Sequence, residues 1–285
     1  MSGLKTILQK ELADHATSWR FVILFVIVFA VGIFAIYEDA QYIREAVTET
    51  RFVFLQLYTT SGQTPLPLFM LFMAFFMPIV GITLGFDAVN SERNSGTLSR
   101  LLAQPIYRDT VINGKFLAGV ATIAIMLASM VLVVAGLGLR MIGVPPSSEE
   151  AVRLMTYLIM SIIYSSFWLG LAILFSVFFQ RVATSVLASI ALWMLFSFMF
   201  ILPAFVQLGQ LGFIIMRVSP VTLFLQVTNL ILIPVTEPPG GLISTLSIGQ
   251  SLLTAWPYLV SLIALTVVCF AVSYIKFMRE EIRAT

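Results

Sequence analysis

The sequence predicts an all-α integral membrane protein with six transmembrane helices, in a single domain that covers residues 1–285. Hydrophobic residues make up 59% of the 285 residues and charged residues only 11%, whereas about a quarter of the residues of a soluble domain are charged. The mean hydropathy is +1.01. Uncharged apolar runs long enough to cross a hydrocarbon core of about 30 Å recur along the chain. Six spans would place eleven Lys and Arg residues on one side and five on the other. The positive-inside rule then makes the richer side, with both termini, cytoplasmic.

Residues 4–18 are predicted to form an amphipathic helix on the membrane surface. The apolar residues that recur at helical spacing are Leu4, Ile7, Leu8 and Leu12. Polar residues occupy the other side of this helix. A solvated leader without a functional role is the alternative. A cleaved signal peptide is disfavoured, because no strong small-residue cleavage site follows the first apolar run.

The six apolar runs predict spans at 21–37, 66–86, 116–139, 155–179, 182–202 and 256–275. Gln180 and Arg181 leave only a tight inner turn between the fourth and fifth spans. The second span contains Gly81 and Gly85 in a small-xxx-small spacing, which permits close approach of another helix. The segment 38–65 is expected to be an external loop.

Residues 203–255 are predicted to form an outer region of re-entrant or half-buried extracytoplasmic helices. The apolar stretch 221–235 resembles a seventh span, but fifteen residues reach only about 22 Å as a helix, short of the hydrocarbon thickness. A seventh span would also place Lys276, Arg279 and Arg283 outside, against the positive-inside rule.

The segment 87–115 is the longest polar interval between two apolar runs, and it is predicted to be a cytoplasmic loop. Gly96 and Thr97 supply a break and an N-cap for a short helix over 98–103, which Pro105 ends. The apolar residues at positions i, i+3 and i+4 of this helix are Leu98, Leu101 and Leu102. A short helix with such a stripe has the shape of an element that enters a groove of a soluble partner. An ordinary interfacial helix between two spans is the alternative.

Nine residues of this loop follow a recognisable pattern: Glu92, Arg93, Gly96, Thr97, Leu98, Leu101, Leu102, Pro105 and Arg108. Their spacing, E-R-x-x-G-T-L-x-x-L-L-x-x-P-x-x-R followed by G-K, resembles the cytoplasmic loop of ABC type-2 (ABC-2) permeases. The resemblance implies that these nine residues form a coupling element that docks on a separate ABC ATPase subunit, with the three leucines in a groove of that partner. Glu92 is expected instead to hold the geometry of the loop or to pair with a basic residue of the loop or of the partner.

The resemblance implies the permease subunit of an ATP-binding-cassette transporter in the cell (plasma or inner) membrane. Two permease copies, as a homodimer or a close heterodimer, would assemble with two ATPase subunits that bind ATP and Mg. Membrane lipid and an extracytoplasmic accessory protein are further expected partners, and nucleic acid is not. The Lys10-Glu11-Leu12 leader and the loop also resemble the permease that accompanies nitrous-oxide reductase maturation, a branch tied to copper-site assembly.

By the same resemblance, spans two and five face the second copy across the translocation path. The phenylalanines that would form an apolar gate there are Phe75, Phe76, Phe196, Phe198 and Phe200. Ordinary packing against lipid or within the core is the alternative for all of them.

The sequence contains no motif for catalysis or metal binding. Gly114 and Lys115 do not belong to a P-loop, because Asp109 stands at the position of the first glycine and Phe116 replaces the Ser or Thr that would hold magnesium. His15 is the only histidine, which excludes an H-E-x-x-H site and a Ser/His nucleophile pair. This chain is therefore not expected to be an enzyme or to hold a cofactor, and any ATP hydrolysis belongs to another chain.

The expected function is ATP-driven transport, as an exporter or as a mechanotransmitter that passes force to an outer partner. The alternative is a non-transporting membrane scaffold or sensor that recruits a soluble protein through the 87–115 loop. An intramembrane enzyme is a third interpretation. Movement of a substrate that depends on ATP distinguishes the first interpretation from the other two.

Overall fold

The computed structural model describes residues 2–45, 52–59, 67–102, 107–201, 210, 217–233, 235–236 and 244–279. Nearly all of these residues are helical, and five of the described helices are long and apolar enough to cross a membrane. The prediction of a helical membrane protein is therefore confirmed. Among the described residues, two short antiparallel strands, β1 (Val235–Thr236) and β2 (Ser244–Thr245), depart from the predicted all-α fold.

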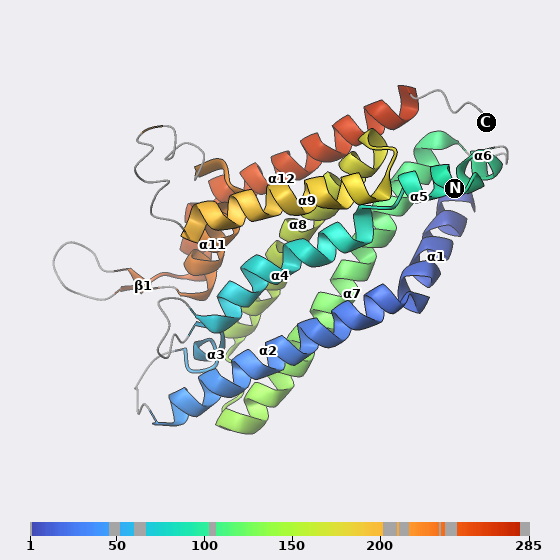
Figure 1. Cartoon of the computed structure of the whole chain (residues 1–285). Helices are drawn as coiled ribbons and strands as arrows, with labels where there is room; N and C mark the ends of the chain where they lie inside the picture. The colour runs from blue at the N-terminus through green and yellow to red at the C-terminus, as the bar shows by residue number, and fades with distance from the viewer. Residues whose placement is uncertain are drawn as a thin grey trace.

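The long helices run between two ends of an elongated bundle (Figure 1). They are α2 (Trp19–Glu45), α4 (Leu68–Gly85), α7 (Arg108–Ile142), α8 (Ser148–Phe178), α9 (Val182–Ile201) and α12 (Ile248–Arg279). Of these, α9 is not among the five candidate spans. Its 20 residues nevertheless reach about 30 Å as a helix.

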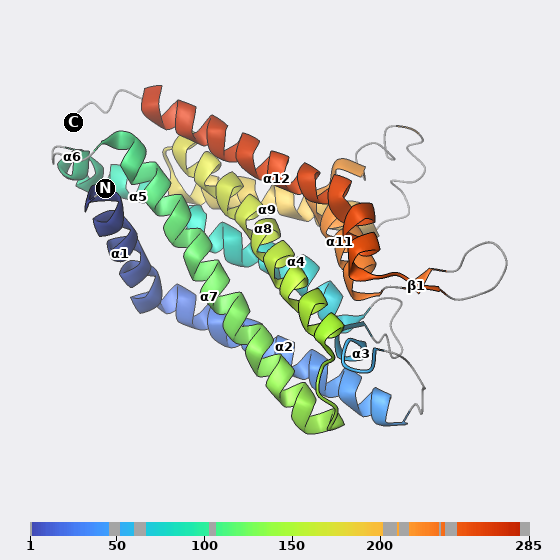
Figure 2. The ribbon, with the colours of Figure 1, turned by 180° about the vertical axis from the view of Figure 1, so that it is seen from behind.

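The shorter elements gather at the two ends of the bundle (Figures 1 and 2). Helices α1 (Ser2–Thr17), α5 (Asn90–Asn94) and α6 (Thr97–Leu102) lie near the last turns of α12, at what we call the α6 end. Helices α3 (Gln56–Thr59) and α11 (Pro220–Leu232) lie with β1 at the opposite end, the α3 end. The segments that the charge count assigns to the cytoplasm thus share one end, and those assigned to the outside share the other.

Several helices are longer than the spans predicted from hydropathy. Helix α2 continues through Glu45, so the predicted external loop at 38–65 begins as helix. Helices α7, α8 and α12 all begin before the predicted spans. Hydropathy marks where a helix meets lipid, whereas the helix itself ends only at a breaker or a cap. Helix α7 ends in this way at Gly143, which has a φ of 80°.

Helix α4 packs closely on α8 through the two glycines of the predicted spacing. A Cβ atom on Gly81 would lie 2.5 Å from the backbone oxygen of Ser165, and one on Gly85 would lie 2.8 Å from that of Leu169. Neither distance leaves room for a methyl group. The two glycines of the small-xxx-small spacing therefore allow α4 to pack closely against α8 of the same chain.

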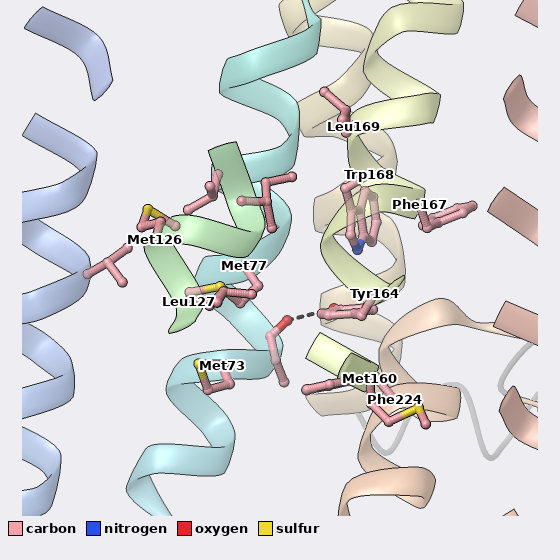
Figure 3. Close-up of a cluster of buried hydrophobic side chains, with 14 of the residues drawn as sticks. Met73, Met77, Met126, Leu127, Met160, Tyr164, Phe167, Trp168, Leu169 and Phe224 are labelled. Atoms are coloured by element: carbon pink, nitrogen blue, oxygen red, sulfur yellow. Dashed lines mark hydrogen bonds between the residues drawn. The ribbon is translucent and has the colours of Figure 1, made fainter. Parts of the chain in front are cut away.

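The core between α4, α7, α8 and α11 is rich in methionine and aromatic side chains (Figure 3). Tyr164 of α8 stacks on Phe224 of α11, with ring centroids 4.3 Å apart, and its hydroxyl donates to the backbone oxygen of Ala74 at 2.7 Å. Ala74 lies four residues before Pro78, which has no N–H to complete the helical hydrogen bond. Tyr164 thus satisfies a carbonyl that the proline leaves unpaired inside the bundle.

Helix α11 has 13 residues, or about 20 Å, and is too short to span a membrane, as the sequence predicts. It is held by Arg153, which is fully buried. The Arg153 guanidinium donates to the backbone oxygens of Ile231 at 2.9 Å and Leu246 at 2.6 Å, and it pairs with Glu149 at 2.8 Å. A cation at the C-terminal end of α11 also complements the helix dipole. The guanidinium also donates to the Ser251 hydroxyl at 3.2 Å, so Arg153 joins α8 to α11 and to the start of α12.

Candidate functional site

The described part of the loop between α4 and α7 contains two short helices joined by a tight turn. After α4 ends at Gly85, α5 follows at Asn90–Asn94 and α6 at Thr97–Leu102. Gly96 between them has a φ of 70°, in the left-handed region that favours glycine. The Thr97 hydroxyl donates to the backbone oxygen of Glu92 at 3.3 Å, which closes the turn.

The inner side of this loop is fixed by a group of four charged side chains, which we call the ionic cluster: Lys10, Glu11, Glu92 and Lys115. The Lys115 Nζ atom lies 2.9 Å from Oε1 of Glu11 and 2.9 Å from Oε1 of Glu92. The Lys10 Nζ atom approaches the same two oxygens at 3.1 and 3.3 Å. The Lys115 side chain is only 4% exposed and that of Lys10 is 46% exposed. The cluster thus joins α1, α5 and α7 through one buried and one partly exposed lysine.

The ionic cluster is balanced, with two positive and two negative charges. Burial alone would raise the pKa of Glu11, but Lys115 and Lys10 hold this pKa below its ordinary value. Burial acts in the opposite direction on Lys10, whose pKa is nevertheless raised by Glu11 and Glu92. Glu11 and Lys10 therefore stay charged at neutral pH, and each charge of the cluster has an opposite charge in contact.

The sequence around Gly114 explains how the cluster forms. Helix α1 packs along the first turns of α7, where a Cβ on Gly114 would lie 2.6 Å from the Cγ2 atom of Ile7. Ile7 is 3% exposed, and Glu11 follows it by four residues on the same face of α1. The Gly114-Lys115 pair of the sequence pattern thus has two uses, since the glycine admits α1 and the lysine meets its carboxylate.

Two further contacts bind α5 to α8 and to the turn that follows it. The Ser176 hydroxyl accepts hydrogen bonds from the backbone N–H groups of Val89 at 2.9 Å and Asn90 at 3.2 Å. These are N–H groups at the start of α5, which lack partners within the helix. At the other end of α5, the Asn94 side chain donates to the backbone oxygen of Gln180 at 3.0 Å. The loop is therefore hydrogen-bonded at both ends of α5.

A cavity of about 230 Å³ lies beside the ionic cluster, between α1, the start of α2 and the end of α4. Arg20 pairs with Asp87 at its wall, and the Arg20 guanidinium lies 5.4 Å from the ring centroid of Phe86. His15 also lines the cavity, and burial lowers the pKa of its imidazole, so the ring is neutral at pH 7. Among the described residues, no group of His, Cys, Asp and Glu side chains is arranged to hold a metal ion.

Comparison with known families gives a match to a model described as ABC-2 family transporter protein, over residues 5–282. The chain belongs to the ABC-2 family. It is accordingly the membrane subunit of an ABC transporter, a type of subunit without an ATPase site of its own. A search of curated proteins finds no match.

The structure places the ABC-2 loop residues in different environments. Leu98 is 1% exposed and belongs to the buried core, and Leu101 packs against that core. In this single subunit Leu98 and Leu101 therefore contact their own chain, and the insertion of the leucines into a partner stays a prediction. Arg93 and Arg108 are half-buried, whereas Gly96 and Thr97 are exposed. Pro105 and the side chain of Leu102 lie outside the described part of the chain.

The phenylalanines expected to form a gate do not form one group in the single chain. Phe75 and Phe76 are half-buried against the core, and the Phe76 ring lies 4.9 Å from that of Phe72. Phe196 packs edge-on against Trp168 at 6.4 Å. Phe198 is 46% exposed, and the side chain of Phe200 lies outside the described residues. Of the four whose side chains are described, only Phe198 is largely exposed, and a gate between two copies of this ABC-2 subunit stays a prediction.

Glu92 is expected from the sequence to pair with a basic residue, but the sequence does not identify that residue. The structure identifies Lys115 of the same loop, and it adds Glu11 and Lys10 of α1. One signal was present in the sequence, because Glu11 lies on the face of α1 that Ile7 marks as apolar. A carboxylate on a buried face requires a positive partner. Nothing in the sequence pointed to Ser176.

Proposed function

We propose that this ABC-2 chain is a six-span permease subunit and that a separate ATPase subunit drives it through the exposed tip of the α5–α6 loop. The observation that carries the proposal is the way in which the loop is held. Its inner side is bonded to α1, α7 and α8 through the ionic cluster and Ser176, whereas the tip, residues 94–97, is exposed. A displacement of the tip by a partner is therefore transmitted to these helices rather than absorbed within the loop.

The distribution of basic residues supports a cytoplasmic α6 end. Eleven of the sixteen Lys and Arg residues belong to segments assigned to that side, as the positive-inside rule requires. ATP and Mg would then bind to the ATPase subunit beneath this end. Export of a substrate between two copies and transfer of force to an outer partner both use this coupling.

Contact between the tip and the ATPase is tested by cysteine cross-linking. Cys269 is the only cysteine, so Cys269→Ser provides a background for Ser95→Cys at the tip and for Val144→Cys, which is 44% exposed between α7 and α8. In native membranes, Ser95→Cys should cross-link to the ATPase subunit and Val144→Cys should not. Equal cross-linking from both positions, or none from Ser95→Cys while the ATPase copurifies, would contradict the assignment of the tip.

Helix α9 supports an assembly of two permease copies. It exposes large apolar side chains, among them Leu187 at 65% and Phe198 at 46%, and it contains no charged residue. In the Cys269→Ser background, Leu187→Cys should cross-link two copies efficiently. The control is Leu132→Cys on α7, a position that is 73% exposed. More efficient cross-linking through Leu132→Cys would assign the interface to α7 instead.

A further inference from the structure

A cavity of about 590 Å³ lies between α11 and α12, away from the ionic cluster. Its polar lining consists of Arg217, Thr222 and Gln226 on one side and Tyr258 and Ser261 on the other. None of the described residues that line it carries a carboxylate. The described lining is therefore polar and includes one cationic side chain, that of Arg217, on an otherwise apolar pair of membrane helices.

Helix α11 contributes two polar side chains and Leu223 to the lining of this recess. Thr222 and Gln226 lie four residues apart on one face, whereas Val221, Phe224 and Val227 are fully buried at 0% exposure. Within the described part of the chain, the side chains of Thr222, Gln226 and Tyr258 make no hydrogen bond to another residue. Polar groups that are held in an apolar setting without internal partners are available to a ligand.

The position of the recess along α12 indicates its depth in the membrane. Helix α12 is continuous, and Lys276 lies in its last turn. Tyr258 precedes Lys276 by eighteen residues, or about 27 Å of helix, which is close to the hydrocarbon thickness of roughly 30 Å. Trp256, next to the recess, is 57% exposed, as is typical of aromatic residues at the membrane interface. With Lys276 at one surface, the recess lies at the headgroup level of the other leaflet.

We propose that this recess binds the phosphate-bearing headgroup of a lipid in the leaflet at the α3 end. Arg217 supplies the positive charge, and Thr222, Tyr258 and Gln226 supply neutral donors to the phosphate oxygens. The Ser261 hydroxyl donates to the backbone oxygen of Pro257 at 2.8 Å and is not counted among these donors.

Apolar surface beside the recess favours a lipid over free phosphate. Leu223 and Pro257 complete the lining. On α12, Leu253 and Val260 are 74% and 50% exposed, and such side chains provide a surface for an acyl chain.

The experiment measures lipid that stays bound to the purified permease, with its copurifying ATPase, in native mass spectrometry. The probes are phosphatidylglycerol, diacylglycerol with the same acyl chains, and inorganic phosphate. The wild type should retain phosphatidylglycerol in preference to diacylglycerol, and Arg217→Gln should reduce this preference roughly fivefold, because one arginine near an anionic headgroup contributes about that factor. Adding Thr222→Val should reduce it further.

Two variants serve as controls. Arg140→Gln changes an exposed arginine near the C-terminal end of α7 that does not line the recess, and it should behave as the wild type. Arg217→Lys keeps the charge and should restore most of the preference. If Arg140→Gln reduces the preference for phosphatidylglycerol as much as Arg217→Gln does, the preference arises from general surface charge and not from the recess. If the wild type retains phosphatidylglycerol and diacylglycerol equally, the recess does not recognise the headgroup. Either result contradicts the proposal. Displacement of the lipid by millimolar phosphate would identify the ligand as free phosphate, which also overturns it.

Discussion

Lys10 and Lys115 contact the same two carboxylates but differ in burial, so replacing each by methionine should have very different effects on stability. Lys115 lies 2.9 Å from both Glu11 and Glu92, where each contact has a gross attraction of about 6 kcal/mol at an effective dielectric constant near 20. Desolvation offsets much of this attraction. Lys115→Met leaves an excess negative charge in a buried position. Breaking a buried ion pair in this way lowers the free energy of unfolding by about 3–5 kcal/mol. Lys10, with 46% exposure, should contribute about 0–1 kcal/mol, as an exposed ion pair does.

The assay is thermal unfolding of the purified chain in detergent, for Lys10→Met, Lys115→Met, Glu92→Gln and the Glu92→Gln/Lys115→Met double variant. Each buried single variant leaves the cluster with one uncompensated charge. The double variant is neutral again, so it should be more stable than the sum of the two single changes predicts, by about 1–3 kcal/mol of coupling free energy. Glu92→Gln should also reduce the stimulation of the ATPase more than it reduces assembly.

Two results would refute this reasoning. If Lys10→Met and Lys115→Met lower the unfolding midpoint equally, burial does not control the strength of these pairs. If the double variant shows simple additivity, Glu92 and Lys115 are not coupled in solution, and the loop is held by other contacts.

Four further predictions concern the helix contacts and the titrating groups of α1. Gly85→Val should prevent α4 from packing on α8 and lower the yield of folded protein in detergent, whereas a valine on the lipid side of α4 should not. Ser176→Ala removes the acceptor for two N–H groups of α5 and should lower ATPase stimulation several-fold at unchanged copurification, and Ser176→Thr should restore it. Gly96→Val should destabilise the turn by about 1–2 kcal/mol, the cost of a left-handed non-glycine residue, whereas Gly96→Asn should be tolerated. Burial lowers the pKa of His15 from 6.5, and the pKa of Glu11 is lowered from 4.5. On acidification the unfolded state therefore binds a proton at each of these groups before the folded state does, which destabilises the folded state. The unfolding midpoint should therefore fall below pH 6.5 and again below pH 4.5, and His15→Gln should remove only the first step.

Hydropathy and charge predicted the helical class and the assignment of segments to two ends, because both depend on properties local to each segment. A run of uncharged residues must avoid water whatever it packs against. The same patterns did not predict how far α2 and α12 extend beyond their apolar runs, since a helix that leaves the lipid continues until a breaker stops it. The β1–β2 pair was missed because two-residue strands have no periodicity to detect.

The candidate site was predicted less completely, because its contacts join distant parts of the chain. Glu92 pairs with Lys115 across one loop, Lys115 pairs with Glu11 of the leader, and Glu92 pairs with Lys10 of the leader. Only the folded position of α1 reveals these neighbours. The stripe that contains Leu98 shows a related difficulty, since an amphipathic helix can turn its apolar face toward a partner or toward its own chain. Leu98, at 1% exposure, does the latter, and no sequence pattern distinguishes the two cases.

Helix α8 connects the two ends of the molecule more directly than the sequence order suggests. Ser176 caps α5 at the α6 end, and Arg153 binds the last turn of α11 at the α3 end. The two residues are twenty-three positions apart, or about 35 Å of one continuous helix. Between them, Gly81 and Gly85 bring the backbone of α4 into close contact with α8. Movement of α5 therefore either carries α8 and α11 with it or breaks buried hydrogen bonds, and the free energy of those bonds favours concerted movement.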